Sequence, residues 1–246
     1  MIYWDLRGAD EHPALALGEA PAGLLSAPEQ VFLRRLATPK RRGEWILGRY
    51  AAKALCRAWL ARQGRRVSPA SLTVAAAPDG APFVLLKGEG PLPVTISLSH
   101  RAGAALVALV EAPRAALGAD LEWVEPRAPS FVESFFTPAE AAAVASSGDP
   151  DRTATEIWSV KEAALKGVRL GLRADTRAVE VRPRPNRAEG WARVEVGLAL
   201  AGAPERATAF VRDAGHHLLS LTLLDAGPDV EPADELRSWP ALDVAA

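Results

Sequence analysis

The chain has 246 residues, enough for one larger domain or for two modest lobes that each bury a core. A hydrophobic content of 49% and a formal net charge of -1 argue against a disordered chain. The longest apolar run, 102–110, is far shorter than the roughly 18 residues of a membrane span. No export signal is visible at the N-terminus, and the single cysteine, Cys56, cannot form an internal disulfide. We therefore expect a cytoplasmic protein with a buried thiol.

Positive charge is concentrated in the segment 31–66. It contains eleven lysines and arginines and one acid, Glu44. Such a surface should attract an anionic ligand or partner. The segment 226–246 is instead acidic and contains prolines, so we expect a solvated tail there.

The first part of the chain predicts an α+β lobe over residues 1–115. Its predicted elements are a strand at 2–6, helices within 27–62, and strands at 71–75, 83–86, 94–99 and 104–110. Within the main helix, 44–60, Arg49, Lys53 and Arg57 follow one another at four-residue spacing, which predicts three cations in a row on one face. His100 and Arg101 are expected in the loop between the last two strands.

The second part predicts another α+β lobe over 116–225, followed by the tail 226–246. Its predicted elements are a strand at 117–122, helices at 138–146 and 152–168, and strands at 176–182, 191–198, 207–212 and 217–224. The two lobes are of comparable plan, although the sequence shows no convincing internal repeat.

Two carboxylates stand out at the start of the second lobe. Asp120 and Glu122 lie two apart in a predicted strand, so both side chains emerge on the same face. Magnesium prefers such hard oxygen ligands and completes its shell with water and substrate phosphate. An ordinary exposed strand edge is the alternative for this pair alone.

The helix 152–168 carries a matching stripe. Trp158, Glu162 and Lys166 recur at four-residue spacing on one face. A surface ion pair between Glu162 and Lys166 would contribute only about 0.2–0.5 kcal/mol. Stability therefore gives a weak reason for the pair, although a simple surface pair remains open when it is considered alone.

Together these motifs resemble those of the Sfp-type 4'-phosphopantetheinyl transferases. Gly118-Ala-Asp-Leu-Glu122 is similar to the family's Gly-hydrophobic-Asp-hydrophobic-Glu motif, and 158–166 to its Trp-Ser-x-Lys-Glu-x-x-x-Lys motif. Upstream, Ser97-Leu-Ser-His100 resembles a Ser-His strand end, and the segment 40–53 a basic Gly-Arg-x-x-Ala-Lys helix. Phe135-Phe-Thr-Pro-Ala-Glu140 fits between them.

The resemblance implies an α+β fold of two similar lobes related by a pseudo-twofold axis, in the monomeric branch, with coenzyme A in the cleft between them. It also implies a metal site and a cofactor site. Asp120, Glu122 and Glu162 would hold Mg2+, and Lys166 would contact the diphosphate. The remaining coenzyme A contacts would come from Arg49, Lys53, Gly80, Pro82, Ser99 and His100. Ala81 stands where the family commonly has lysine, and Ala119 replaces a usual β-branched residue.

The implied reaction is transfer of 4'-phosphopantetheine from coenzyme A to a serine of an apo acyl or peptidyl carrier protein. Glu162 and Lys166 would be the catalytic pair, with Glu162 as base, as metal ligand or as both. Adenosine 3',5'-bisphosphate would leave. The carrier could serve fatty acid, polyketide or nonribosomal peptide assembly, and we expect neither nucleic acid nor membrane as a partner.

We weigh three alternatives to this function. An RNA- or nucleotide-binding module could use the basic surface 31–66, although it leaves the carboxylates unexplained. Another magnesium-dependent nucleotide phosphotransferase lacks support, because the sequence has no glycine-rich phosphate loop followed by Lys-Ser/Thr. A catalytically silent coenzyme A binder is the third.

Overall fold

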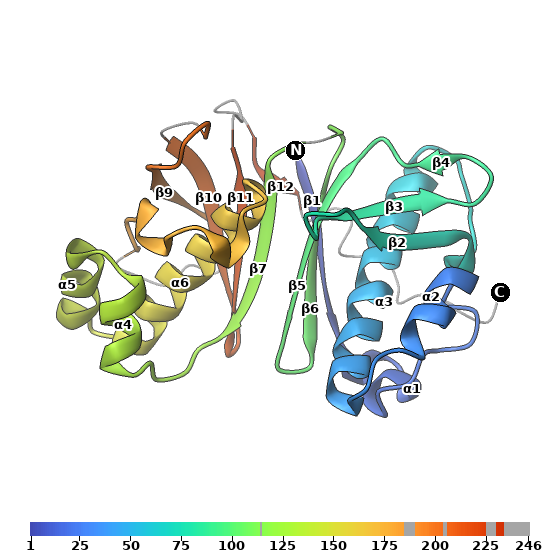
Figure 1. The fold of residues 1–246 in the computed structure, drawn as a ribbon, viewed down its shortest axis with the longest axis horizontal. Coiled ribbons are helices and arrows are strands. Elements are labelled where there is room, and N and C mark those ends of the chain that lie inside the picture. Colours follow the sequence, from blue (N-terminus) through green and yellow to red (C-terminus); the bar gives the residue numbers. More distant parts are fainter. Residues whose placement is uncertain (114, 185–189, 204–205, 225–229, 234–246) are drawn as a thin grey trace. The chain divides into compact units, whose positions relative to one another are not determined.

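A computed structural model shows that the chain folds into two compact units, described separately below (Figure 1). The structure describes residues 1–113, 115–184, 190–203, 206–224 and 230–233. Unit 1 comprises Met1–Arg114 and Glu231–Ala246, and unit 2 comprises Ala115–Val230. The chain thus returns to unit 1 after unit 2. Residues 231–233, which the sequence assigned to a separate tail, lie in unit 1.

Unit 1 contains one mixed sheet, one antiparallel sheet and one long helix. The first sheet has the strand order β12-β1-β6-β5 and the second the order β2-β3-β4. The strands are β1 (Ile2–Gly8), β2 (Leu72–Ala76), β3 (Pro82–Leu86), β4 (Gly90–Pro91), β5 (Thr95–Arg101), β6 (Ala104–Val110) and β12 (Pro232–Ala233). The helices are α1 (Pro13–Ala16), α2 (Ala27–Leu33) and α3 (Pro39–Arg62), with short 3-10 helices at Ala9–Glu11 and Pro69–Ser71.

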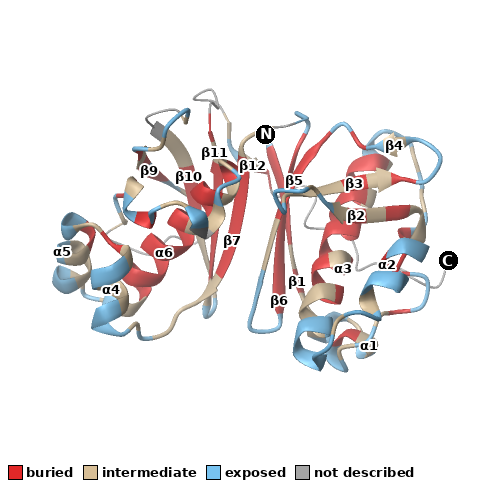
Figure 2. Cartoon of the chain, viewed as in Figure 1, coloured by how far each residue is buried: buried red, intermediate tan, exposed pale blue. Residues whose placement is uncertain are grey.

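The core of unit 1 forms around α3. This helix begins at Thr38, whose hydroxyl accepts the backbone N–H of Arg41, and Pro39 occupies its first turn. Its buried residues include Ile46, Leu47, Tyr50 and Leu55, which pack with the inward side chains of both sheets. Figure 2 shows that much of α3 is buried. Burial of apolar surface at about 25 cal/mol per Å2 is the main source of stability for such a layer.

Unit 2 has one five-stranded antiparallel sheet, in the order β7-β11-β10-β9-β8, with α6 packed along it (Figure 1). The strands are β7 (Leu117–Trp123), β8 (Val179–Val181), β9 (Ala192–Leu198), β10 (Arg206–Ala214) and β11 (His217–Leu223). The helices are α4 (Pro129–Phe135), α5 (Pro138–Ser146) and α6 (Pro150–Gly167), with 3-10 helices at Gly171–Arg173 and Thr176–Ala178. In each unit the first strand pairs antiparallel with the last strand of a hairpin, β1 with β6 and β7 with β11.

The predicted α+β class is confirmed, and most predicted elements are confirmed in type and order. Two details were wrong. His100 and Arg101 lie within β5, paired with Ala105 and Ala104, because the hairpin turn is shorter than expected. Thr176 begins a 3-10 turn, since the Asp175 side chain accepts the N–H of Arg177 there. The helix α4 was not predicted. The pseudo-twofold relation concerns the placement of the units and stays a prediction.

The predicted burial of Cys56 is confirmed. The thiol is 0% exposed and free, and burial raises its pKa to about 12, so it stays protonated at neutral pH. Among the described residues, no helix is long and apolar enough to cross a membrane.

Candidate active site

The glycine that opens the Asp-x-Glu motif is required by the packing of β7 against α6. A Cβ added to Gly118 would lie 1.7 Å from the carbonyl oxygen of Ala163, a distance that no side chain permits. The strand and the helix therefore approach each other as closely as backbones can. This contact brings Asp120 and Glu122 against the helix residues that follow Trp158.

Asp120 is almost completely buried, and both of its oxygens have partners from other elements. Its Oδ1 accepts a hydrogen bond from Lys166 Nζ at 2.6 Å, and its Oδ2 accepts one from Ser159 Oγ at 2.9 Å. Ser159 Oγ lies 2.7 Å from Ser220 Oγ of β11. These partners on both oxygens hold the Asp120 side chain in one orientation.

Glu122 is also held at both oxygens. Trp158 Nε1 donates to Oε1 at 3.1 Å, and Arg127 donates to Oε2 at 3.0 Å. The Trp158 ring packs against Phe131 and Phe135 at centroid distances of 4.8 and 5.2 Å. The first residue of the predicted helical stripe thus positions a carboxylate of the strand.

The environment of Glu162 disfavours the charge of its carboxylate. Burial, together with the negative charges of Asp120 and Glu122, raises the pKa of Glu162 to about 7, against the opposing effect of Lys166. The distance from Lys166 Nζ to Glu162 Oε2 is 3.8 Å. These interactions show that the three carboxylates share one region, and a pKa near 7 is suited to proton transfer at neutral pH.

Magnesium fits this region by donor chemistry. Three carboxylates, Asp120, Glu122 and Glu162, supply hard oxygen ligands and an excess of negative charge that the nearby cations Lys166 and Arg127 do not cancel. Among the described residues, no group of three acid, histidine or cysteine side chains is already arranged to hold a metal ion. Metal binding would therefore require the three carboxylates to move closer together.

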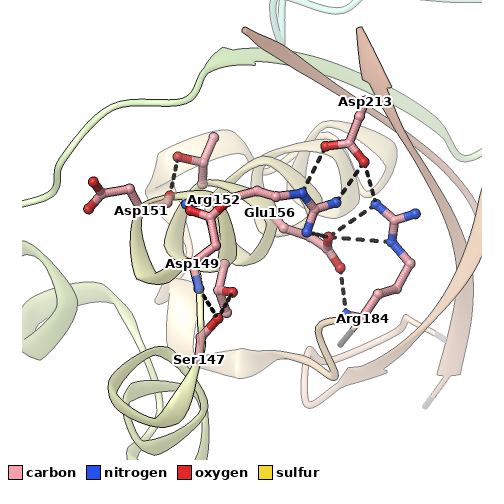
Figure 3. Close-up of polar contacts among 9 residues, drawn as sticks. Ser147, Asp149, Asp151, Arg152, Glu156, Arg184 and Asp213 are labelled. Carbon is pink, nitrogen blue, oxygen red and sulfur yellow. Dashed lines mark hydrogen bonds and ion pairs between the residues drawn. The ribbon is translucent and has the colours of Figure 1, made fainter. Parts of the chain in front are cut away.

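The start of α6 is fixed by a buried network of two arginines and two acids (Figure 3). Arg152 makes two hydrogen bonds of 2.8 Å to Asp213 of β10 and an ion pair of 3.0 Å with Glu156. Arg184 bonds both Glu156, at 3.2 Å, and Asp213, at 3.4 Å. Bidentate pairs of this kind are directional. They anchor the helix that carries Glu162 and Lys166 to the sheet.

The three cations predicted in a row on α3 do not form a surface that is available to a ligand. Lys53 is 0% exposed, and its ammonium contacts Glu29 at 2.5 Å and the Leu24 carbonyl at 2.7 Å. Arg57 donates to the Val67 carbonyl at 2.8 Å. The coenzyme A contact expected of Lys53 does not fit this position, because its charge is already paired inside unit 1.

Arg49 keeps more capacity for a ligand. Its guanidinium lies 4.1 Å from the centroid of the Trp45 ring and makes one long hydrogen bond, 3.5 Å, to the Val74 carbonyl. Burial lowers the pKa of Arg49 to about 10, so it is still a cation at neutral pH.

Lys53, Arg57 and Arg49 all contact groups of the protein itself. The basic segment 31–66 therefore offers an RNA less charge than the sequence indicates.

The remaining predicted cofactor residues also lie in unit 1. Ser99 and His100 occupy the end of β5, where His100 is exposed and Ser99 half-buried. Gly80 lies in the turn before β3 with a φ of +91°, a conformation that favours glycine, and Pro82 begins that strand. Gly48 of α3 packs against Leu98, which places the helix turn of Arg49 beside β5.

Sequence reasoning missed two kinds of residue around the acids. Ser159 and Ser220 support Asp120, and only the proximity of Ser159 to Trp158 in the motif could have indicated a role. Arg127 pairs with Glu122 from the segment between β7 and α4, and no pattern in the sequence marks it.

Comparison with known protein families gives a match to part of unit 2. Residues 116–196 match the family described as the 4'-phosphopantetheinyl transferase superfamily. No curated protein matches the sequence significantly. Among solved structures, the chain is similar to the holo-[acyl-carrier-protein] synthase of Neisseria meningitidis, with 20% identity and a TM-score of 0.37, covering 46% of this chain and 98% of that one.

The matched segment contains Asp120, Glu122, Glu162 and Lys166. It supports a 4'-phosphopantetheinyl transferase at the level of the superfamily. It does not separate the Sfp-type branch from the holo-[acyl-carrier-protein] synthase branch.

Proposed function

We propose that this chain is an Sfp-type, magnesium-dependent 4'-phosphopantetheinyl transferase, which moves the phosphopantetheine arm of coenzyme A onto a serine of an apo acyl or peptidyl carrier protein. One observation carries the proposal: Asp120, Glu122 and Glu162, from a strand and a helix far apart in sequence, share one region with Lys166. The superfamily match over 116–196 supports it.

Glu162 acts as the base in this proposal. The serine Oγ forms a bond to the phosphorus that carries pantetheine, and its proton passes to the Glu162 carboxylate directly or through a water. Without a metal, burial and the neighbouring carboxylates raise the pKa of Glu162 to about 7, which favours acceptance of a proton at neutral pH. The bond from that phosphorus to the bridging oxygen breaks, and adenosine 3',5'-bisphosphate leaves.

Lys166 neutralises charge that develops on the departing phosphate. Its ammonium pairs with Asp120 and so lies beside the acids, and the Lys166 side chain is 29% exposed. Asp120, Glu122 and Glu162 would hold Mg2+, which when bound would offset the charge of the diphosphate. The protein's contribution is chiefly the positioning of groups and of charge, as phosphoryl transfer requires.

The phosphorylated nucleoside end of coenzyme A carries a further phosphate that needs cationic partners. Arg49 offers a guanidinium with one long bond, and His100 lies exposed at the end of β5. Planar guanidinium groups bind phosphate through two N–H donors at once. We assign Arg49 and His100 to this end of the cofactor and leave Lys53 to its pair with Glu29.

The direct test is to incubate the protein with coenzyme A, Mg2+ and a set of apo carriers and to weigh each carrier by intact-mass spectrometry. We expect a gain of one phosphopantetheine on at least one carrier, lost when EDTA replaces Mg2+. No gain on acyl carriers of fatty acid and polyketide assembly or on peptidyl carriers would reject the transferase.

Glu162→Gln tests the base within the same assay. We expect a single-turnover rate about 10²- to 10⁴-fold below that of the wild type, because the amide cannot accept the proton. Glu195→Gln, at an exposed position of β9, is the matched control and should retain the wild-type rate. Near-normal turnover by Glu162→Gln would remove the base from the mechanism while leaving the transferase standing.

A further inference from the structure

Glu122 lies in a closed ring of contacts. Its Oε1 accepts the Trp158 indole N–H, the Trp158 ring meets Phe131 edge to face, the Arg127 guanidinium lies 5.2 Å from the Phe131 centroid, and Arg127 returns to Glu122 Oε2 at 3.0 Å. Both carboxylate oxygens of Glu122 therefore accept hydrogen bonds from the protein.

The two partners of Glu122 differ in their freedom to leave. Trp158 is buried within α6 and packed among phenylalanines, so it cannot withdraw without disturbing the core. Arg127 lies in the segment 124–128, which is neither helix nor strand, and its side chain is 14% exposed. Its Nε is buried and has no hydrogen-bond partner among the described residues. Rotation of the Arg127 side chain alone would release Oε2.

Arg127 has a second acid within reach. Its Nη1 lies 3.6 Å from Glu125 Oε1, so the guanidinium keeps a carboxylate partner when it leaves Glu122. A guanidinium and a divalent ion beside the same carboxylate repel each other, and this repulsion is strong in a region of low exposure. Arg127 and a divalent cation therefore compete for Glu122.

We propose that Arg127 is a displaceable counter-ion of Glu122, which keeps this carboxylate oriented and charge-balanced when no metal is bound and gives it up when a divalent cation enters. This inference rests on the metal site of the proposed function. Arg127 is a positioning residue here. It sets how tightly the metal binds, whereas Trp158 keeps the carboxylate in place in both states.

Manganese binding to the protein alone tests the competition. We expect Arg127→Met, which removes the charge and keeps an apolar contact for Phe131, to bind Mn2+ roughly tenfold more tightly than the wild type in calorimetric or paramagnetic-resonance titrations. Arg127→Lys keeps the charge and should bind Mn2+ within about threefold of the wild type. Arg182→Met, at an exposed arginine of the same unit, is the control and should not change the affinity.

Unchanged or weaker Mn2+ binding by Arg127→Met would overturn the inference, since a merely structural arginine stabilises the carboxylate without competing. If neither the wild type nor a variant binds Mn2+, the metal site itself is rejected, and this inference with it. Chemical labelling of the wild type gives a second measurement that needs no variant. Phenylglyoxal should modify Arg127 faster in the presence of Mg2+, as peptide mapping would show, and an unchanged rate would contradict displacement.

Discussion

Aspartates on the first strand of each unit show how neighbouring residues decide a carboxylate's use. Asp5 of β1 and Asp120 of β7 are both followed by leucine and then by a charged residue, Arg7 in one unit and Glu122 in the other. Arg7 Nε donates to Asp5 at 2.7 Å, so this acid is matched by a cation from its own strand. In β7 the second residue is another acid. Two negative charges therefore lie together on β7, beside α6, whereas on β1 the acid is paired with Arg7.

The environment of Asp5 gives a prediction about pH and stability. Burial, opposed by the neighbouring Arg7, raises the pKa of Asp5 from 3.8 to about 6. The folded protein therefore holds this proton more tightly than the unfolded chain does. The stability it contributes is complete below about pH 4 and is lost as the pH rises through about 6.

Asp5→Asn should remove this dependence. Between pH 4 and 7 we expect the free energy of unfolding of the wild type to fall by up to about 3 kcal/mol relative to that of the variant. Urea titrations at several pH values would measure the difference. Asp10→Asn, at an exposed site nearby, should follow the wild type. Parallel pH profiles for Asp5→Asn and the wild type would contradict the prediction.

At the scale of elements, the two units repeat one buried construction. In unit 1 a capping-box acid, Glu29, accepts the N–H of Ser26 at the start of α2, the Lys53 ammonium of α3 and the N–H of Val74 in β2. In unit 2 the corresponding acid is Glu140. It accepts the N–H of Thr137 at the start of α5, the ammonium of Lys161 in α6 and the N–H of Val181 in β8. Each pair ties a short helix, the long helix and a strand together.

The two units differ in the type of residue that follows each buried lysine. Ala54 follows Lys53 in α3, whereas Glu162 follows Lys161 in α6. The shared construction thus orients both long helices, and only the second carries an acid at the next position. This matches the difference between Arg7 and Glu122 on the strands.

Lys53→Met and Lys161→Met should each destabilise the unit that contains the pair. Removing one partner leaves a buried carboxylate uncompensated, which costs about 3–5 kcal/mol. Hydrogen exchange of β2 in the first variant and of β8 in the second would report the loss locally, alongside urea unfolding. Lys87→Met, at an exposed turn, is the control. A loss below about 1 kcal/mol for either variant would contradict a structural role.

These pairs also show where sequence reasoning reaches its limit. Helical spacing correctly places Trp158, Glu162 and Lys166 on one stripe, and strand alternation sends Asp120 and Glu122 to α6. Spacing gives the direction of a side chain but not what packs over it. Lys53 was expected on an open basic face, and α2 covers it with Glu29. Arg127 reaches Glu122 from a segment without periodicity, so no pattern could have predicted the contact.

At the scale of the whole molecule, the chain order interleaves the units. Unit 2 is made from one continuous segment, while unit 1 is completed by β12, which pairs in parallel with β1 through Ile2 with Pro232 and Tyr3 with Ala233. The Ile2 N–H donates to the Glu231 carbonyl at 3.0 Å. The acidic segment that composition assigned to a solvated tail therefore supplies an edge strand. Residues 231–233 pair with the backbone of β1, which composition alone does not reveal.

Ala233→Asp should loosen this edge. Ala233 is 8% exposed within the core of unit 1, and an unpaired charge placed there costs several kcal/mol or forces β12 away from β1. Hydrogen exchange of Ile2 and Tyr3 should become faster, and melting should begin at a lower temperature. Ala201→Asp, at an exposed turn of unit 2, is the matched control and should leave both unchanged. Unaltered exchange in β1 would show that β12 contributes nothing.

The late position of β12 has a consequence for synthesis. During synthesis, β1, β5 and β6 are translated long before residues 231–233. The edge of β1 that later pairs with β12 therefore has no strand partner while unit 2 is translated. Open strand edges of this kind invite pairing with other chains. Slow translation of the second half should therefore lower the yield of correctly folded protein, and chaperones that shield strand edges should restore it.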